Sequence, residues 1–145
     1  MQRYVYTLSL IAFALAGAVA QDAKDTEKAA ATRKALMSKI SVDYKDTLMQ
    51  DVVTDLADQM KTATSMKVAT KLDVTSGVSQ NTKVTHEAKN KTVAEVLDEI
   101  GKKYDIGYVV VSGTYKSPTK TFGKEFDGTI IIKKGSERGY PEKSK

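Results

Sequence analysis

Apolar and polar residues alternate in several short stretches of this chain, which is the pattern of β-strands with one buried face. The clearest stretch runs from Ile40 to Tyr44. A nearly continuous apolar run at 106–111 predicts a well-buried strand, and 128–132 is its expected antiparallel partner. Together, the predicted strands lie at 40–44, 68–74, 83–88, 106–111 and 128–132.

Between the strands, the apolar spacing changes to three and four residues, which predicts two amphipathic helices. The first helix carries a stripe at Leu48, Val52, Leu56 and Met60. Thr47 and Gln50, at its start, have the spacing of a capping box. The second helix is predicted to start at a capping box formed by Thr92 and Glu95. Its apolar residues are Val93, Val96, Leu97, Ile100 and Tyr104.

The resulting element order is β-α-β-β-α-β-β, within residues 39–134. It predicts an α+β fold, with two helices packed on a small mixed β-sheet. A shift of 44 residues superimposes the patterns of 52–56 and 96–100, and places Lys45-Asp46 on Lys89-Asn90. This similarity is typical of a duplicated β-α unit, and it also arises by chance between amphipathic helices.

The first twenty residues have the composition of an export signal. They contain one cation, Arg3, then an apolar run that ends in Ala18-Val19-Ala20, the small-residue pattern that a signal peptidase reads. The run is shorter than the roughly 20 residues that a membrane span needs. We therefore predict a signal peptide at 1–20, a mature chain that starts at Gln21 with no transmembrane segment, and a periplasmic or secreted protein.

The regions that flank the predicted domain have few apolar residues. Residues 21–38 contain Ala, Lys and Glu, which favour a helix, but few apolar residues that could dock it, so they are expected to form a flexible, solvated spacer with at most a frayed helix. Apart from Tyr140, residues 135–145 are Gly, Ser, Pro and charged residues, and they are expected to form a flexible tail.

The composition excludes several kinds of site. The chain has 145 residues and no cysteine, so disulfides, thiolate metal sites and cysteine nucleophiles are excluded. A formal net charge of +5 is mild and does not by itself indicate a nucleic-acid partner. One histidine excludes a metal centre built from several imidazoles.

Candidate catalytic groups are few and isolated. His86 is the single imidazole, and its neighbour Glu87 points to the opposite face of the predicted strand. The other candidates are two acid pairs and one Ser-x-x-Lys spacing: Asp55 with Asp58, Asp98 with Glu99, and Ser117 with Lys120. The acid pairs are expected on solvated helix faces, and the Ser-x-x-Lys lies in a proline-containing loop rather than at a helix start. We expect no enzyme activity, no cofactor and no metal.

The segment at 113–127 is the strongest candidate for partner binding outside the sheet. It interleaves aromatic and cationic residues: Tyr115, Lys116, Lys120, Phe122, Lys124 and Phe126. If the rings are exposed, they can stack on bases or sugars while the lysines attract anions. If the hairpin folds back, the rings of Phe122 and Phe126 pack on the domain. No motif predicts specific nucleic-acid binding.

Two longer segments, 40–60 and 83–100, resemble the short N-terminal domain of secretins and TonB-dependent transducers. Each has that family's order of a strand, a polar pair and an amphipathic helix, and the second contains Thr92-Val93-x-x-Val96-Leu97-x-x-Ile100. Residues 108–111 and 127–132 resemble the family's closing hairpin. The resemblance covers about 39–134 and specifies a fold better than a function.

In that family the domain precedes an outer-membrane pore or barrel and docks other proteins from the periplasm. Neither a barrel nor a secretin core follows here, so we expect a stand-alone binding domain. The leading hypothesis is a non-catalytic interaction domain that binds an envelope protein through a free sheet edge or through 113–127. The alternative is an anionic polymer or glycan bound at the cell surface through Lys116, Lys120, Lys124, Lys133 and Lys134.

Overall fold

The computed structural model describes residues 24–141, and this range contains three α-helices. They are α1 (Glu27–Ala35), α2 (Met49–Thr64) and α3 (Val93–Tyr104). The strands are β1 (Lys39–Leu48), β2 (Thr70–Leu72), β3 (Lys83–Thr92), β4 (Ile106–Val110), β5 (Tyr115–Lys116), β6 (Thr121–Phe122), β7 (Ile130–Lys134) and β8 (Arg138–Gly139). Two 3₁₀ turns are η1 (Val74–Ser76) and η2 (Lys124–Phe126). The α+β prediction is confirmed: β1-α2-β2-β3-α3-β4-β7 has the predicted order, and the other elements are additional.

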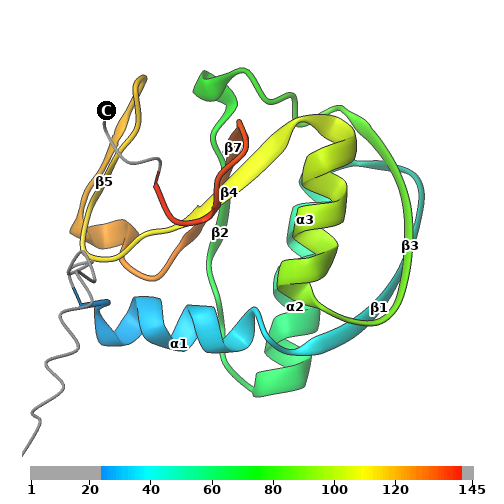
Figure 1. Ribbon diagram of the computed structural model, residues 1–145, viewed down its shortest axis with the longest axis horizontal. Helices are drawn as coiled ribbons and strands as arrows, with labels where there is room; N and C mark the ends of the chain where they lie inside the picture. The colour runs from blue at the N-terminus through cyan, green and yellow to red at the C-terminus, as the bar shows by residue number, and fades with distance from the viewer. Residues whose placement is uncertain (1–23, 142–145) are drawn as a thin grey trace, which may run out of the picture.

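The helices α2 and α3 lie between two β layers (Figure 1). One layer is an antiparallel ribbon of β1 and β3. The other is a mixed sheet in the order β2-β7-β4-β8, in which β7 runs parallel to β2 and antiparallel to β4. The helix α2 contacts β1 and β2, while α3 contacts β3 and β4. The pairing of β4 with β7 confirms the antiparallel partners predicted from the sequence.

Both helices bury most of the stripes that their sequence pattern predicts, while Leu48, predicted in the first stripe, ends β1 instead and is only half-buried. Val52, Leu56 and Met60 of α2 are buried, as are Val96 and Ile100 of α3, and all five belong to one core between the layers. Each helix therefore has an apolar side facing the core and polar residues on the remaining surface.

The two predicted helix starts have different outcomes. At α3, the Thr92 side chain accepts from the Glu95 N–H and the Glu95 carboxylate accepts from the Thr92 N–H, so the predicted capping box is confirmed. At α2 the predicted box is wrong, because Thr47 still belongs to β1 and the N-cap is Leu48, which makes no side-chain cap. A carbonyl from a distant segment serves instead: the Met49 N–H donates to the Thr82 C=O at 2.8 Å.

The two β-α units repeat each other closely. The bounds of β1 and β3 differ by 44 positions at both ends, and so do the starts of α2 and α3. Each strand has a bulge, at which Asp46 and Asn90 have φ values of 48° and 52°. A hydroxyl of the opposite strand accepts from each bulge N–H: Thr85 Oγ1 from Asp46 and Ser41 Oγ from Asn90.

The two units also exchange the bonds that satisfy their helix N-termini. The Val93 N–H of α3 donates to the Ser38 C=O at 3.0 Å, which is the 44-residue counterpart of the Met49–Thr82 bond. The register of β1 and β3 is symmetric about the pair Asp43 and Glu87, so an approximate two-fold axis that relates the two units passes between these residues. Amphipathic helices do not by themselves produce matching bulges and capping bonds, so the duplicated unit suggested by the sequence is present as a structural repeat.

The prediction of a flexible spacer at 21–38 is wrong over its described part, 24–38. The helix α1 is docked, and its buried residues include Ala29, Thr32 and Ala35, followed by Leu36 at the C-cap. Small residues permit a close approach: a Cβ added at Gly128 would lie 2.8 Å from the Cβ of Lys28. Tertiary contacts rather than an apolar stripe therefore order this helix.

The prediction of a flexible tail at 135–145 is wrong over 135–141, which we call the C-terminal strap. Within it, β8 pairs in parallel with β4. The Arg138 Nε donates to Asp98 Oδ1 at 2.5 Å, which ties the strap to α3. The predicted signal peptide, residues 21–23 and residues 142–145 lie outside the described residues. Among the residues that are described, no helix is long and apolar enough to cross a membrane.

Candidate functional site

The aromatic part of the predicted binding segment belongs to the core. Phe122 is 0% exposed and Tyr115 is 6% exposed, and their rings stack at 5.9 Å between centroids. Phe126 meets Phe122 edge-on at 5.3 Å. These rings pack with Val109, Val111 and Ile131 in a second, smaller core. Of the two arrangements that the sequence left open, the structure therefore has the folded-back hairpin, and Tyr115 and Phe122, predicted as partner-binding residues, offer no exposed surface.

The lysines of the same segment remain exposed. Lys116, Lys120 and Lys124 all face solvent, and the Lys120 Nζ lies 5.2 Å from the centroid of the Phe122 ring. Lys133 differs from the prediction, since it is buried and forms an ion pair with Glu137. A polymer can therefore reach three of the five predicted cations directly, with Lys134 engaged in an exposed ion pair and Lys133 inaccessible.

His86 receives a carboxylate partner that the sequence did not indicate. Its Nε2 lies 3.0 Å from Glu99 Oε2 of α3, an ion-pair distance at which the two atoms form no aligned hydrogen bond. Glu99 also forms an ion pair with Lys91.

In the other β-α unit, the Tyr44 hydroxyl donates to the Asp55 carboxylate at 2.7 Å. Burial of Tyr44 together with this bond raises its pKa above the usual value.

These contacts have a common structural purpose. Asp55 and Glu99 are counterparts in the 44-residue repeat, and each joins its helix to an inward-facing residue of the ribbon. The 44-residue repeat of the sequence thus already placed Glu99 at the position that Asp55 has in the first unit. Asp58 is exposed, and Asp98 accepts from Lys102 and Arg138, which lowers its pKa. Within each predicted acid pair, the two carboxylates thus have different surroundings and do not face a common site.

The free edges of the ribbon are the most extended unpaired backbone in the described chain. A two-stranded sheet leaves alternate N–H and C=O groups of each strand pointing away from the partner strand. On β3, side chains of α3 cover this edge at Thr85. The Tyr104 hydroxyl accepts from the Thr85 N–H at 2.8 Å, and the Lys103 Nζ donates to the Thr85 C=O at 2.9 Å. The outward backbone groups of Thr85 on the β3 edge are therefore already occupied.

The corresponding position on β1 has no such cover. Ser41 is the counterpart of Thr85, and Met60 is the counterpart of Tyr104 in the repeat. Met60 is fully buried and has no hydroxyl to offer. Among the described residues, no side chain forms a hydrogen bond to the Ser41 backbone. The approximate two-fold symmetry of the ribbon is thus broken at its edges, and the β1 edge is the open one.

The edges of the mixed sheet are shorter or blocked. At one side, β2 has only three residues. At the other, the Gly139 C=O of β8 accepts from the Arg33 guanidinium at 2.8 Å, so α1 closes this edge. Neither offers the ten residues that β1 presents.

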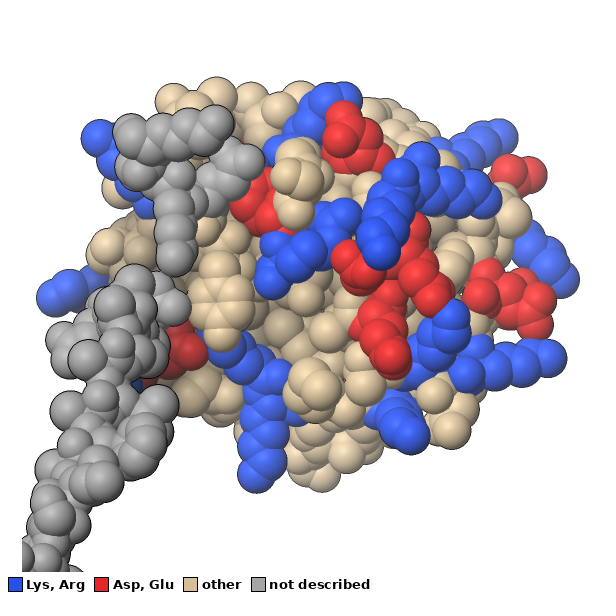
Figure 2. All heavy atoms as spheres, in the orientation of Figure 1, with Lys and Arg blue, Asp and Glu red and all other residues tan. Residues whose placement is uncertain are grey.

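The ribbon, seen from its side at the right of Figure 2, carries charges of both signs. Asp43 and Glu87 lie directly opposite each other, and each forms an ion pair along its own strand, with Lys45 at 3.1 Å and Lys89 at 3.3 Å. A mixed charge pattern opposes non-specific aggregation of an open edge and allows a partner of complementary charge to be selected.

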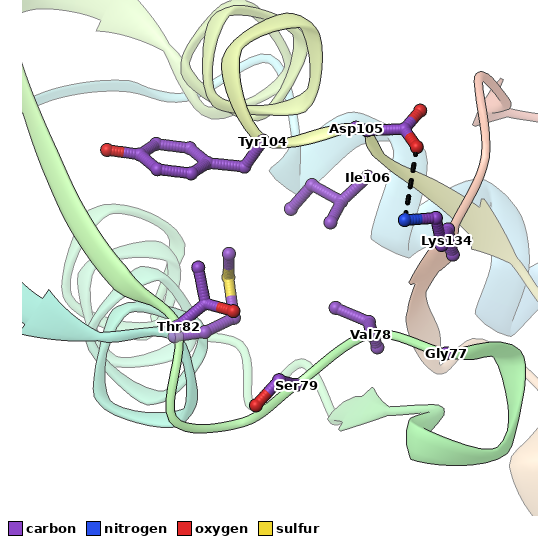
Figure 3. A pocket seen from close by; sticks show the side chains of 9 residues that line it. Gly77, Val78, Ser79, Thr82, Tyr104, Asp105, Ile106 and Lys134 are labelled. Carbon is purple, nitrogen blue, oxygen red and sulfur yellow. Dashed lines mark ion pairs between the residues drawn. The ribbon is translucent and has the colours of Figure 1, made fainter.

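A small pocket lies at the end of the ribbon where β3 begins (Figure 3). Its walls come from α2, α3, β4 and the loop before β3, and an ion pair between Asp105 and Lys134 stands at its side. In the described part of the chain, no group of three or more His, Cys, Asp or Glu residues is arranged to hold a metal ion. Comparisons with protein-family models, with curated proteins and with solved structures gave no match.

Proposed function

We propose that this chain is a non-catalytic protein-interaction domain of the bacterial envelope, which binds an extended segment of a partner protein along the outer edge of β1. The observation that carries this proposal is an asymmetry of the ribbon: Tyr104 and Lys103 cover the β3 edge at Thr85, whereas the counterpart position on β1, Ser41, has no such cover. An extended segment can form main-chain hydrogen bonds with such an edge without any special side chain.

Two sequence features support the location in the envelope. The N-terminal twenty residues have the pattern of an export signal, and residues 39–134 resemble the short N-terminal domain of secretins and TonB-dependent transducers. The candidate catalytic groups support a binding role, because His86, Asp55 and Glu99 all join the ribbon to the helices.

Replacing Asp43 with proline should abolish partner binding while leaving the domain folded. The Thr85 N–H points away from β1, and the N–H of Glu87, two positions further along β3, therefore does so too. Its cross-strand neighbour Asp43 correspondingly points its N–H away from β3, toward the outer edge of β1. Proline at such a position is tolerated at a sheet edge but removes the donor that an added strand needs. The measurement is capture of proteins from an envelope extract of the source cell on the immobilised chain, followed by a salt gradient.

The repeat supplies a matched control for this experiment. Glu87→Pro makes the same change at the counterpart position of the covered edge, and its thermal unfolding should match that of Asp43→Pro. We expect proteins that resist high salt to be retained by Glu87→Pro and lost with Asp43→Pro. Equal retention by both variants would contradict binding at the β1 edge.

The exposed lysines of 113–127 support a second candidate, an anionic polymer or glycan. Here, replacing Lys116, Lys120 and Lys124 with alanine should release the chain from a heparin matrix at markedly lower salt, because polyanion binding depends on counterion release. Alanine at Lys45, Lys61 and Lys102 makes the same change of charge elsewhere and should alter the elution less. Similar elution of both triple variants would show that only net charge matters.

A further inference from the structure

The exposed residues in the first half of β1 form a self-complementary charge pattern. Lys39, Ser41 and Asp43 alternate with the buried residues Ile40 and Val42, so all three lie on the outer face of the ribbon. Lys39 and Asp43 have opposite charges and lie equally far from Ser41 in the sequence. A second, antiparallel β1 strand centred on Ser41 therefore places each lysine directly opposite an aspartate.

The main-chain groups of this stretch have the direction that such a pairing requires. The Asp43 N–H points toward the outer edge of β1, so the N–H groups of Ser41 and Lys39, two and four positions earlier, do so too. In an antiparallel pair, residues whose N–H and C=O groups face the partner strand lie directly opposite each other. Ser41 thus meets its own copy, and Lys39 meets Asp43 of the copy, in hydrogen-bonded pairs.

Other registers of two β1 strands are less favourable. Moving the centre one residue forward sets Lys39 against Lys45, and a further step sets Asp43 against its own copy. The next step pairs Asp43 with Lys45, but the β1 bulge, where Asp46 has a φ of 48°, interrupts the ladder there. A centre before Ser41 carries Asp43 past the start of the opposite strand. A parallel copy in register sets every charge beside its equivalent.

A second copy also supplies counter-charges that the ribbon itself does not. Directly opposite Asp43 on β3 lies another carboxylate, Glu87, and like charges at such positions are unfavourable. The ion pair of Asp43 with Lys45 joins two exposed side chains of the same strand and contributes little. Within the described residues, Lys39 forms no ion pair. Pairing of two β1 strands gives Asp43 a cation on the side away from Glu87, and gives Lys39 a carboxylate.

The repeat explains why such an assembly stops at two copies. By the 44-residue shift, the counterparts of the three exposed β1 residues on β3 are Lys83, Thr85 and Glu87, with the same order of charges. The outward backbone groups of the central residue, Thr85, are bonded to Tyr104 and Lys103. The β3 strands at the two sides of the joined sheet are therefore covered at the centre of their own self-complementary pattern, which opposes further growth.

We propose that two copies of this chain form a two-fold symmetric dimer, in which their β1 strands pair in antiparallel fashion about Ser41. Lys39 of each copy pairs with Asp43 of the other, and the two ribbons join into one sheet in the order β3-β1-β1-β3. This inference rests on the open β1 edge of the proposed function and names a second copy of the chain as an occupant of that edge. A partner strand then binds by displacing the second copy.

The test is sedimentation equilibrium of the full chain and of two variants that each reverse one charge. We expect the unchanged chain to form a dimer whose share rises with concentration. In its own dimer, Lys39→Glu sets two carboxylates against each other at both pairs, and Asp43→Lys does the same with two ammonium groups. Each variant should weaken the dimer at least about tenfold, because two cross-strand pairs change from attractive to repulsive.

A mixture of these two variants tests the register. In a mixed dimer, Asp43 of the Lys39→Glu copy faces Lys39 of the Asp43→Lys copy, and the two introduced charges also face each other with opposite signs. We expect the mixed dimer to form with an affinity close to that of the unchanged chain. Lys83→Glu is the matched control, because it makes the same change at the counterpart position on β3, and it should leave the dimer unchanged.

The proposal is wrong if the chain stays a monomer, if Lys83→Glu weakens the dimer as much as Lys39→Glu, or if the mixture does not restore it. Its failure can be told apart from failure of the proposed function. A monomeric chain whose captured proteins are still lost with Asp43→Pro would overturn the dimer and leave the proposed function standing. A dimer with the expected charge dependence that captures no protein would support the dimer and overturn the proposed function.

Discussion

Replacing Glu137 with glutamine is expected to lower the free energy of unfolding by about 3–5 kcal/mol, because it leaves the charge of Lys133 buried without a counter-charge. The side chains of Lys133 and Glu137 are each only 8% exposed and form an ion pair between the end of β7 and the C-terminal strap. The Lys133 Nζ also donates to the Lys134 C=O at 2.9 Å, which does not neutralise the charge. Urea unfolding of the full chain measures the loss.

The surroundings of Glu137 explain why the site cannot easily relax. A Cβ added at Gly107 would lie 2.7 Å from the Glu137 backbone nitrogen, so the strap crosses β4 directly over this glycine. Gly135 has a φ of +138° and is likewise in close contact with the Glu137 carboxylate. Water has little room to enter and solvate an unpaired ammonium group. The strap is therefore expected to detach from β4 in the single variant.

A second substitution separates the charge effect from the loss of packing. In the double variant Lys133→Met with Glu137→Gln, neither charge is buried, and most of the stability should return. Glu87→Gln removes an exposed ion pair with Lys89 and should change the unfolding free energy by less than about 1 kcal/mol. A loss of under 1 kcal/mol for Glu137→Gln would mean that the pair is open to solvent.

Truncation of Phe122 to alanine should cost about 3–5 kcal/mol of stability, the range for large aromatic residues in a core. Phe122 is fully buried and contacts the rings of both Tyr115 and Phe126. Its removal leaves a cavity between the β5–β6 hairpin and the mixed sheet. The measurement is again urea unfolding, together with the near-ultraviolet signal of the aromatic residues.

The matched control tests the lysine that covers the same ring. Lys120→Ala removes the cation near the Phe122 ring and should lower stability by at most about 1 kcal/mol. The outcome would be different if the hairpin were an exposed binding surface. Phe122→Ala would then weaken heparin binding and cause little loss of stability. That result would favour the exposed aromatic surface, the other of the two arrangements that the sequence left open.

Several features of this fold could be predicted from local patterns. The capping box of Thr92 and Glu95, the apolar stripes of α2 and α3, and the pairing of β4 with β7 all follow from residues close in sequence or from continuous apolar runs. The 44-residue similarity also pointed to the repeat that the two β-α units form, but it left a chance likeness between amphipathic helices equally open. These signals are local because backbone hydrogen bonds and side-chain periodicity act over one or two turns of a helix or along one strand.

Local patterns could not predict that the two ends of the described chain, α1 and the C-terminal strap, are docked on the domain. In α1 the contacts come from alanines and from the bond of Thr32 to the Gly128 C=O at 2.6 Å, which no apolar pattern announces. The strap is polar, and it is ordered because Glu137 and Arg138 meet Lys133 and Asp98. Charged and small residues are equally compatible with a solvated chain, so only the groups placed opposite them decide their role.

The sequence by itself thus determined the α+β class and the order of the main elements, since hydrophobic periodicity and capping residues are properties of short segments, whereas the duplicated unit was decided by the matching bulges and bonds of the structure. The tertiary structure alone decided which side chains are buried, which distant residues meet, and which strand edge is exposed. It buried Phe122, brought Glu99 to His86, and covered the β3 edge with Tyr104 while Met60 left the β1 edge open. Burial and edge coverage depend on residues far apart in the sequence, and those distances are set only when the layers pack.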